Sequence, residues 1–218
     1  MTKLKFYLEF FAILLLFIVP PIAAPFFTPK SDAIYFTGIS PWSALCFVAA
    51  LAIYADLENG CGGEKKIGFR DIFFASELLK TFGCLCLSAA FFEAIGLCLK
   101  LRPQTQIAFP KTLIQGVFCA VSLAVSAFSE ELIYRAYLPR AMKKIWGKEK
   151  RLSQACAEIL PILIFGAAHI SNGILAVMNA IFAGLALRVC AKKTRGIWAG
   201  FLAHFSYNVL ALIMMVFA

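Results

Sequence analysis

Runs of about 20 mostly apolar residues recur along the chain, and they constrain its fold more than any other feature. A helix needs about 20 such residues to cross the roughly 30 Å hydrocarbon core of a bilayer. The pattern predicts an all-α, polytopic membrane helical bundle with about seven transmembrane helices, within a range of about six to eight. The stretches that reach or approach the required length are about 5–27, 38–55, 74–99, 112 to beyond 135, 155–170, 174–190 and 196–217.

The composition excludes an ordinary water-soluble domain. Of the 218 residues, 61% are hydrophobic and only 15% are charged, whereas soluble domains carry about a quarter charged residues. A single core of this size cannot hide the surplus of apolar side chains, because a folded chain must still present polar surface to water. The lipid bilayer is therefore the expected solvent for the whole chain.

The formal net charge of +9 is an orientation signal and predicts no nucleic-acid partner. Lys and Arg fall in the short segments between the apolar runs, where polytopic membrane proteins carry them. With the N-terminus inside, fifteen of these residues face the cytoplasm, four face the other side and two lie within spans. This asymmetry predicts a cytoplasmic N-terminus and an external C-terminus. The expected location of this multi-pass protein is the cytoplasmic membrane of a prokaryote.

The fourth apolar stretch contains two adjacent glutamates and an arginine: Glu130, Glu131 and Arg135. A charge inside hydrocarbon costs at least ~3 kcal/mol and therefore marks a partner or a function. Glu131 and Arg135 are four residues apart with the acid first, the order that favours an ion pair on one helix face. Glu130 points about 100° away around the helix, so it needs another partner or a water-filled cavity. Other carboxylates near the ends of spans are expected at the membrane interface: Glu9, Glu77 and Glu158.

Both histidines of the chain also lie in apolar stretches. His169 follows Phe165 by four residues in the fifth stretch, and Asn208 follows His204 by four residues in the seventh. Each pair therefore shares one helix face. One intramembrane histidine is usually a packing residue. Here three spans carry two histidines, an amide and an unpaired glutamate, and these groups can form hydrogen bonds with one another in an intramembrane polar cavity. Small residues that permit close helix approach stand beside these motifs, at Gly166 and Gly200.

A carboxylate and two imidazoles around a water-accessible pocket are the parts of a hydrolytic site. Glu130 can take a proton from water, and His169 can share in orienting that water. His204 and Asn208 can donate hydrogen bonds to the oxyanion that develops on an attacked carbonyl group. Water is then the nucleophile, and the chemistry requires no serine or cysteine nucleophile.

These motifs, in this order on successive spans, resemble those of the CPBP family of intramembrane proteases, which includes the type II CaaX prenyl endopeptidases and the bacterial Abi proteins. The three motifs are complete: Glu130-Glu131-x-x-x-Arg135, Phe165-x-x-x-His169 and His204-x-x-x-Asn208. The resemblance covers about residues 112–217. It implies a catalytic core over 112–218, preceded by a variable set of N-terminal transmembrane helices over 1–111.

The resemblance also implies glutamate-dependent peptide hydrolysis in a cavity within the membrane, without a metal or another cofactor. The expected partners are the lipid bilayer and a protein or peptide substrate, which can be lipidated. The implied catalytic residues are Glu130, His169, His204 and Asn208, supported by Glu131, Arg135, Tyr134 and Phe165.

Two alternatives stay open from the sequence. One glutamate and two histidines are a familiar set of zinc ligands; the chain lacks an HExxH motif and its histidines are 35 positions apart, but zinc is not excluded. A non-enzymatic transporter or immunity protein can also use such a cluster as a proton relay or binding pocket.

The expected boundaries contain one conflict in depth. Glu130 lies about 27 Å from the outer start of the fourth span, near its cytoplasmic end. His169 lies about 21 Å from the inner start of the fifth span. These two depths do not coincide, so tilt, a kink or different helix boundaries must bring the two side chains together.

Overall fold

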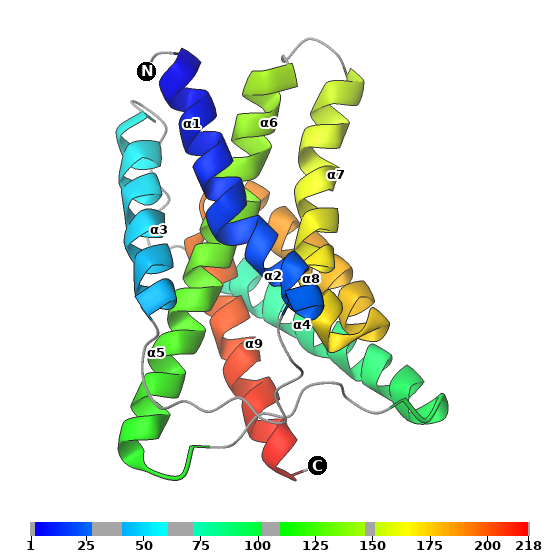
Figure 1. Ribbon diagram of the computed structural model, residues 1–218. Coiled ribbons are helices and arrows are strands. Elements are labelled where there is room, and N and C mark those ends of the chain that lie inside the picture. Colours follow the sequence, from blue (N-terminus) through cyan, green and yellow to red (C-terminus); the bar gives the residue numbers. More distant parts are fainter. Residues whose placement is uncertain (1–2, 28–40, 61–71, 102–109, 147–150, 218) are drawn as a thin grey trace.

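The computed structural model describes residues 3–27, 41–60, 72–101, 110–146 and 151–217. Within these residues the chain forms seven helical rods and no strand, which confirms the predicted all-α bundle (Figure 1). A short 3-10 turn, η3 (Ile170–Asn172), connects the fifth rod to the sixth. The rods are α1, η1 and α2 (Lys3–Ile13, Leu14–Ile18, Val19–Phe27), α3 (Pro41–Gly60), α4 (Ile72–Cys98), α5, η2 and α6 (Leu113–Glu130, Glu131–Tyr137, Leu138–Trp146), α7 (Arg151–Ala167), α8 (Ile174–Thr194) and α9 (Trp198–Phe217).

Several rods have the length and composition of membrane-spanning helices. Two further helices are apolar but shorter than a membrane span requires: Trp42–Leu57 and Trp198–Met214. α7 opens with polar residues, which shorten its apolar stretch. The two ends of the chain lie at opposite ends of the bundle in Figure 1, as an odd number of rods requires. Four described helices are long and apolar enough to cross a membrane: Phe6–Phe26, Phe74–Cys98, Leu113–Trp146 and Ile174–Thr194.

The helix that carries Glu130 is longer than the sequence boundaries suggest. α5, η2 and α6 join into one rod of 34 residues, Leu113–Trp146, and Glu130 lies near its middle. From the sequence, Arg140 and the lysines after it are expected in a segment that connects two spans. The structure instead continues the helix, because one face of α6 is apolar and packs against the core while Arg140 stays exposed.

The longer helix resolves the conflict in depth. Measured from the end where α6 and α7 meet, Glu130 lies 16 residues before Trp146 and His169 lies 18 residues after Arg151. These separations correspond to about 24 Å and about 27 Å at 1.5 Å per residue. The sequence also places His169 within a helix, whereas α7 ends at Ala167 and His169 lies just beyond it. Both residues therefore lie near the middle of the bundle.

Helices from both halves of the chain surround η2. α8 packs against α4, α7 and α9, and α9 also packs against α5. On the other side, Phe6 of α1 and Ile53 of α3 belong to the same buried cluster as Leu132 and Ile133 of η2. The segment that contains the glutamates is thus enclosed on several sides by apolar side chains.

Two glycines allow neighbouring helices to approach closely, as their positions in the sequence predict. A Cβ atom on Gly166 would collide with Ile181 of α8. A Cβ atom on Gly200 of α9 would lie 2.9 Å from a carboxylate oxygen of Glu131. Only a residue without a side chain lets α9 approach the buried glutamate this closely.

Candidate active site

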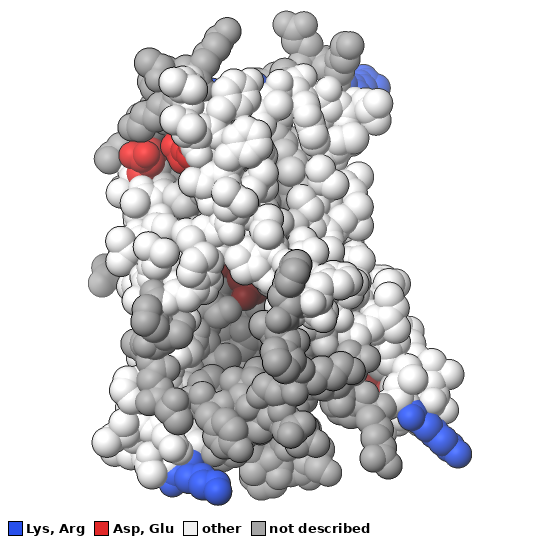
Figure 2. Space-filling view, viewed as in Figure 1, with Lys and Arg blue, Asp and Glu red and all other residues white. Residues whose placement is uncertain are grey.

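A cavity of about 360 Å³ lies halfway along the bundle, where α5 passes into η2. Figure 2 shows a patch of acidic atoms at the bottom of a hollow near the middle of the visible face. One wall comes from α5, η2 and the α7–η3 segment, and the other comes from η1, α2 and α3. Of the eight predicted site residues, four line this cavity: Glu130, Tyr134, Phe165 and His169.

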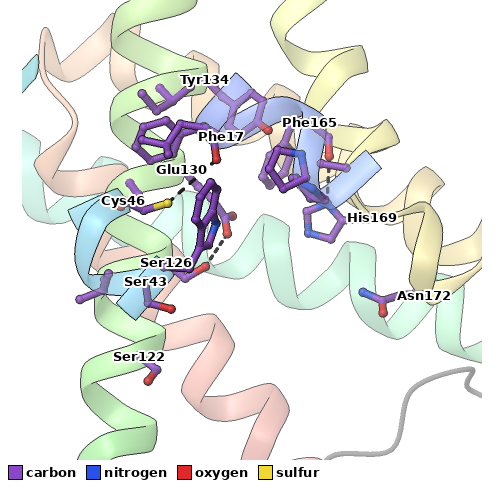
Figure 3. A pocket seen from close by; sticks show the side chains of 18 residues that line it. Phe17, Ser43, Cys46, Ser122, Ser126, Glu130, Tyr134, Phe165, His169 and Asn172 are labelled. Atoms are coloured by element: carbon purple, nitrogen blue, oxygen red, sulfur yellow. Dashed lines mark hydrogen bonds between the residues drawn. The ribbon is translucent and has the colours of Figure 1, made fainter. Parts of the chain in front are cut away.

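Glu130 ends α5 and points into the cavity (Figure 3), with 27% of its side chain exposed. Ser126, one turn earlier, donates a hydrogen bond from Oγ to Oε1 of Glu130 at 2.6 Å. The second carboxylate oxygen, Oε2, lies 3.7 Å from Nε2 of His204. Glu130 therefore has both the separate partner and the cavity that its position on the helix requires.

Glu131 and Arg135 form the ion pair that their spacing predicts. Nε of Arg135 lies 3.5 Å from Oε1 of Glu131, and the side-chain exposures are 1% and 0%. The guanidinium group also lies 4.1 Å from the ring centre of Phe165, a cation–π contact that is strongest where water is excluded. The pair sits in η2, and such π-helical turns are frequent at functional sites.

His204 connects the two glutamates. Its Nδ1 lies 3.1 Å from Oε1 of Glu131, while Nε2 faces Oε2 of Glu130. The residue is only 6% exposed and is not among the residues that line the cavity. When Nδ1 bonds to Glu131, Nε2 is the ring nitrogen that remains to act toward Glu130 or a bound molecule.

His169 faces the cavity from the side of α7 (Figure 3). Its Nδ1 lies 2.9 Å from the main-chain carbonyl oxygen of Phe165, one of the last carbonyls of α7, which lack intrahelical partners. Nε2 is then the nitrogen available for chemistry. Asn172, three residues later, lines the same cavity and is not among the site residues that the sequence predicts.

Asn208 lies on α9 one turn after His204 and is partly buried. It is not among the residues that line the cavity. The structure therefore does not test the oxyanion role predicted for His204 and Asn208, which stays a prediction.

A second charged cluster, which the sequence does not predict, supports η2 from the α6 end. Glu158 of α7 forms ion pairs with Lys143 of α6 and Arg188 of α8, and its Oε2 lies 2.7 Å from Nε of Arg188. Arg188 also donates from Nη1 to the main-chain carbonyl oxygen of Arg135 in η2. Glu158 thus links three helices, whereas its sequence suggests only an interfacial carboxylate. No sequence signal joins it to Arg188, because the two meet only when α7 packs on α8.

Within the part of the chain that the structure describes, no group of three or more His, Cys, Asp or Glu side chains is arranged to hold a metal ion. The arrangement does offer an accessible carboxylate, a histidine that faces the same cavity and a buried ion pair behind the carboxylate. These are the components of general-base hydrolysis.

Comparisons with known proteins point to a protease family. Residues 112–210 match the family model described as type II CAAX prenyl endopeptidase Rce1-like. A protein of Treponema pallidum (strain Nichols), described as an uncharacterized protein, is 37% identical over 81 residues; these are 37% of this chain and 43% of that protein. The chain thus spans less than half the length of this relative. No solved structure matches the chain.

Proposed function

We propose that this chain, whose residues 112–210 match the family model of the type II CAAX prenyl endopeptidases of the Rce1-like kind, is an intramembrane endopeptidase of that family with Glu130 as the general base. The observation that carries the proposal is the difference between two adjacent glutamates. Glu131 is fully buried and paired with Arg135, whereas Glu130 faces the cavity. One carboxylate is thereby fixed in the fold and the other is available for chemistry.

In the proposed reaction, Glu130 takes a proton from water while the water oxygen attacks the carbonyl carbon of the scissile peptide bond. The carbonyl oxygen becomes negatively charged in the tetrahedral intermediate. When the C–N bond breaks, Glu130 returns the proton to the leaving amine, so that the base is regenerated. His169 orients the water through Nε2, and its Nδ1 contact with the Phe165 carbonyl supports this ring orientation.

We assign the stabilisation of the oxyanion to His204 and Asn208, which share one face of α9. In this role both ring nitrogens of His204 carry protons: Nδ1–H donates to Glu131, and Nε2–H, which lies near Glu130, donates to the oxyanion. Glu131 and Arg135 hold the imidazole of His204 in place, while Tyr134 and Phe165 form the wall behind the carboxylate.

The proposed substrate is a membrane-associated protein or peptide, either lipidated or not, because the cavity opens within a bundle of apolar helices. The proposed location is the cytoplasmic membrane of a prokaryote, with the N-terminus in the cytoplasm. Basic residues in the last turns of α6 and α8 support this orientation, because Lys and Arg are enriched on the cytoplasmic side.

A cleavage assay with a chelator tests the proposed mechanism against a zinc enzyme. We expect the purified protein to cleave membrane peptides at an unchanged rate in excess strong chelator, and elemental analysis to find less than about 0.1 zinc per chain. A zinc site of the usual affinity would lose its metal under these conditions. Loss of cleavage on chelation, with recovery on adding zinc, would contradict the glutamate mechanism.

Arg188 is predicted to be a positioning residue for η2. Arg188→Lys keeps a positive charge beside Glu158 but cannot make both contacts of the guanidinium group. We expect kcat to fall about tenfold, or about 1.4 kcal/mol, with KM unchanged, because the change displaces the carbonyl of Arg135 and not the substrate. The measurement is steady-state cleavage in detergent or vesicles.

Lys192 provides the matched control for Arg188. It lies 4.0 Å from the same Glu158 oxygen and its side chain is 59% exposed, so Lys192→Ala should leave kcat and KM within twofold of the original values. An equal loss in both variants would indicate a general effect of charge at this end of the bundle.

A further inference from the structure

We propose that water reaches Glu130 along serine hydroxyls on α5, from the Leu113 end of that helix, and that Ser126 positions the carboxylate. Ser122, Ser126 and Glu130 are spaced by four residues and so share one helix face. All three line the cavity, and Figure 3 shows them one after another along α5. This inference rests on the proposed function for its chemistry, but the path can be tested without cleavage.

Ser129 supplies an independent sign that the cavity holds water. This residue lines the cavity and is only 6% exposed, yet its Oγ has no hydrogen-bond partner among the described residues. Buried hydroxyl groups are almost always satisfied by protein or ordered water. A cavity of about 360 Å³ is large enough for several water molecules. A water bonded to Ser129 would lie beside Glu130, which is the next residue.

Among the described residues, the side of Glu130 toward the α6 end of the rod is tightly packed. η2 follows Glu130 directly, and six of its seven residues are buried. Its apolar residues Leu132 and Ile133 are part of the cluster formed with α1 and α3. Water coming from the α6 end would have to displace this packed core, whereas toward Leu113 the cavity wall carries Ser126 and Ser122.

Ser126 also determines which oxygen of Glu130 is available. Its hydroxyl holds Oε1 at 2.6 Å, and Oε2 remains on the side of His204. The hydrogen bond therefore fixes the rotation of the carboxylate relative to the water that it must deprotonate. This is a positioning role, because the serine oxygen itself takes no part in bond formation.

Cysteine labelling tests the path. Single Ser122→Cys and Ser126→Cys variants are treated with a small, charged, membrane-impermeant thiosulfonate, and peptide mass analysis separates the new cysteine from the native ones. Only a thiol in contact with water forms the reactive thiolate, so both variants should be modified. Val121→Cys is the matched control. Val121 is the neighbour of Ser122, does not line the cavity and has 38% of its surface exposed. In a membrane this surface faces lipid and not water, so the new thiol should react at least about tenfold more slowly.

The side of entry is measured in the same experiment. Lys111→Cys, just before α5, reports which face of the membrane the Leu113 end occupies. Reagent added on that face should modify Ser122→Cys at least about tenfold faster than reagent added on the other face. Equal rates from both faces, faster reaction from the opposite face, or reaction of Val121→Cys as fast as Ser122→Cys would overturn the path.

Kinetics of two substitutions test the positioning role of Ser126. Ser126→Ala should lower kcat about tenfold with KM unchanged, and Ser126→Thr, which retains the hydroxyl group, should restore most of the rate. An unchanged kcat in Ser126→Ala, or an equal loss in both variants, would overturn this role. If the cysteine variants are labelled as expected but the protein cleaves no peptide, the proposed water path still stands and only the proposed function is contradicted.

Discussion

Glu130→Gln is expected to lower kcat for peptide cleavage by at least about 10³-fold while the protein folds as before. The amide has nearly the same shape and can still accept the hydrogen bond from Ser126. It cannot take a proton from water, and general-base catalysis contributes about 10²–10⁴-fold. The measurements are cleavage rates in vesicles and thermal unfolding in detergent.

A matched control for this substitution is Glu93→Gln. Glu93 is an exposed glutamate of α4 that does not line the cavity, so its loss should change kcat by less than twofold. Cleavage by Glu130→Gln within tenfold of the original rate would contradict the role of Glu130. The same pair of variants identifies the substrate, because membrane peptides that accumulate with Glu130→Gln but not with Glu93→Gln are candidates for cleavage.

The sequence predicts the individual motifs well because each is local. The Glu131–Arg135 pair depends only on helical spacing, and the structure contains it. The helical bundle follows from long apolar runs that have no other stable arrangement in lipid. Glu130 needs a separate environment because adjacent residues on a helix face different directions, and the structure gives it a cavity.

Contacts between distant residues could not be read from spacing. His204 and Glu131 are 73 positions apart and meet because Gly200 lets α9 approach η2. Glu158 and Arg188 meet through the packing of α7 on α8. The continuation of the helix to Trp146 could not be predicted for a related reason. The lysines of α6 suggest a loop, but its buried face is apolar, and this amphipathic pattern appears only if the helix is continued.

The buried ion pair should dominate the stability of the site. Arg135→Ala would leave Glu131 with 0% side-chain exposure and without its cationic partner. Removing one member of a buried pair costs about 3–5 kcal/mol, which corresponds to a fall in Tm of about 10 °C for a chain of this length. Thermal unfolding of the purified protein measures this loss. A change of less than about 2 °C would show that His204 alone compensates the carboxylate.

Replacing both members separates stability from activity. In the double variant Glu131→Met, Arg135→Met no buried charge is left uncompensated, and apolar replacements of buried pairs are often neutral or stabilising. We therefore expect most of the lost Tm to return. Cleavage should stay at least about 10²-fold below the original rate, because His204 loses the carboxylate that holds its Nδ1 and its ring is no longer fixed beside Glu130. Recovery of both Tm and cleavage would mean that the pair serves the fold alone; recovery of Tm without cleavage would show that Glu131 acts on the reaction by orienting His204.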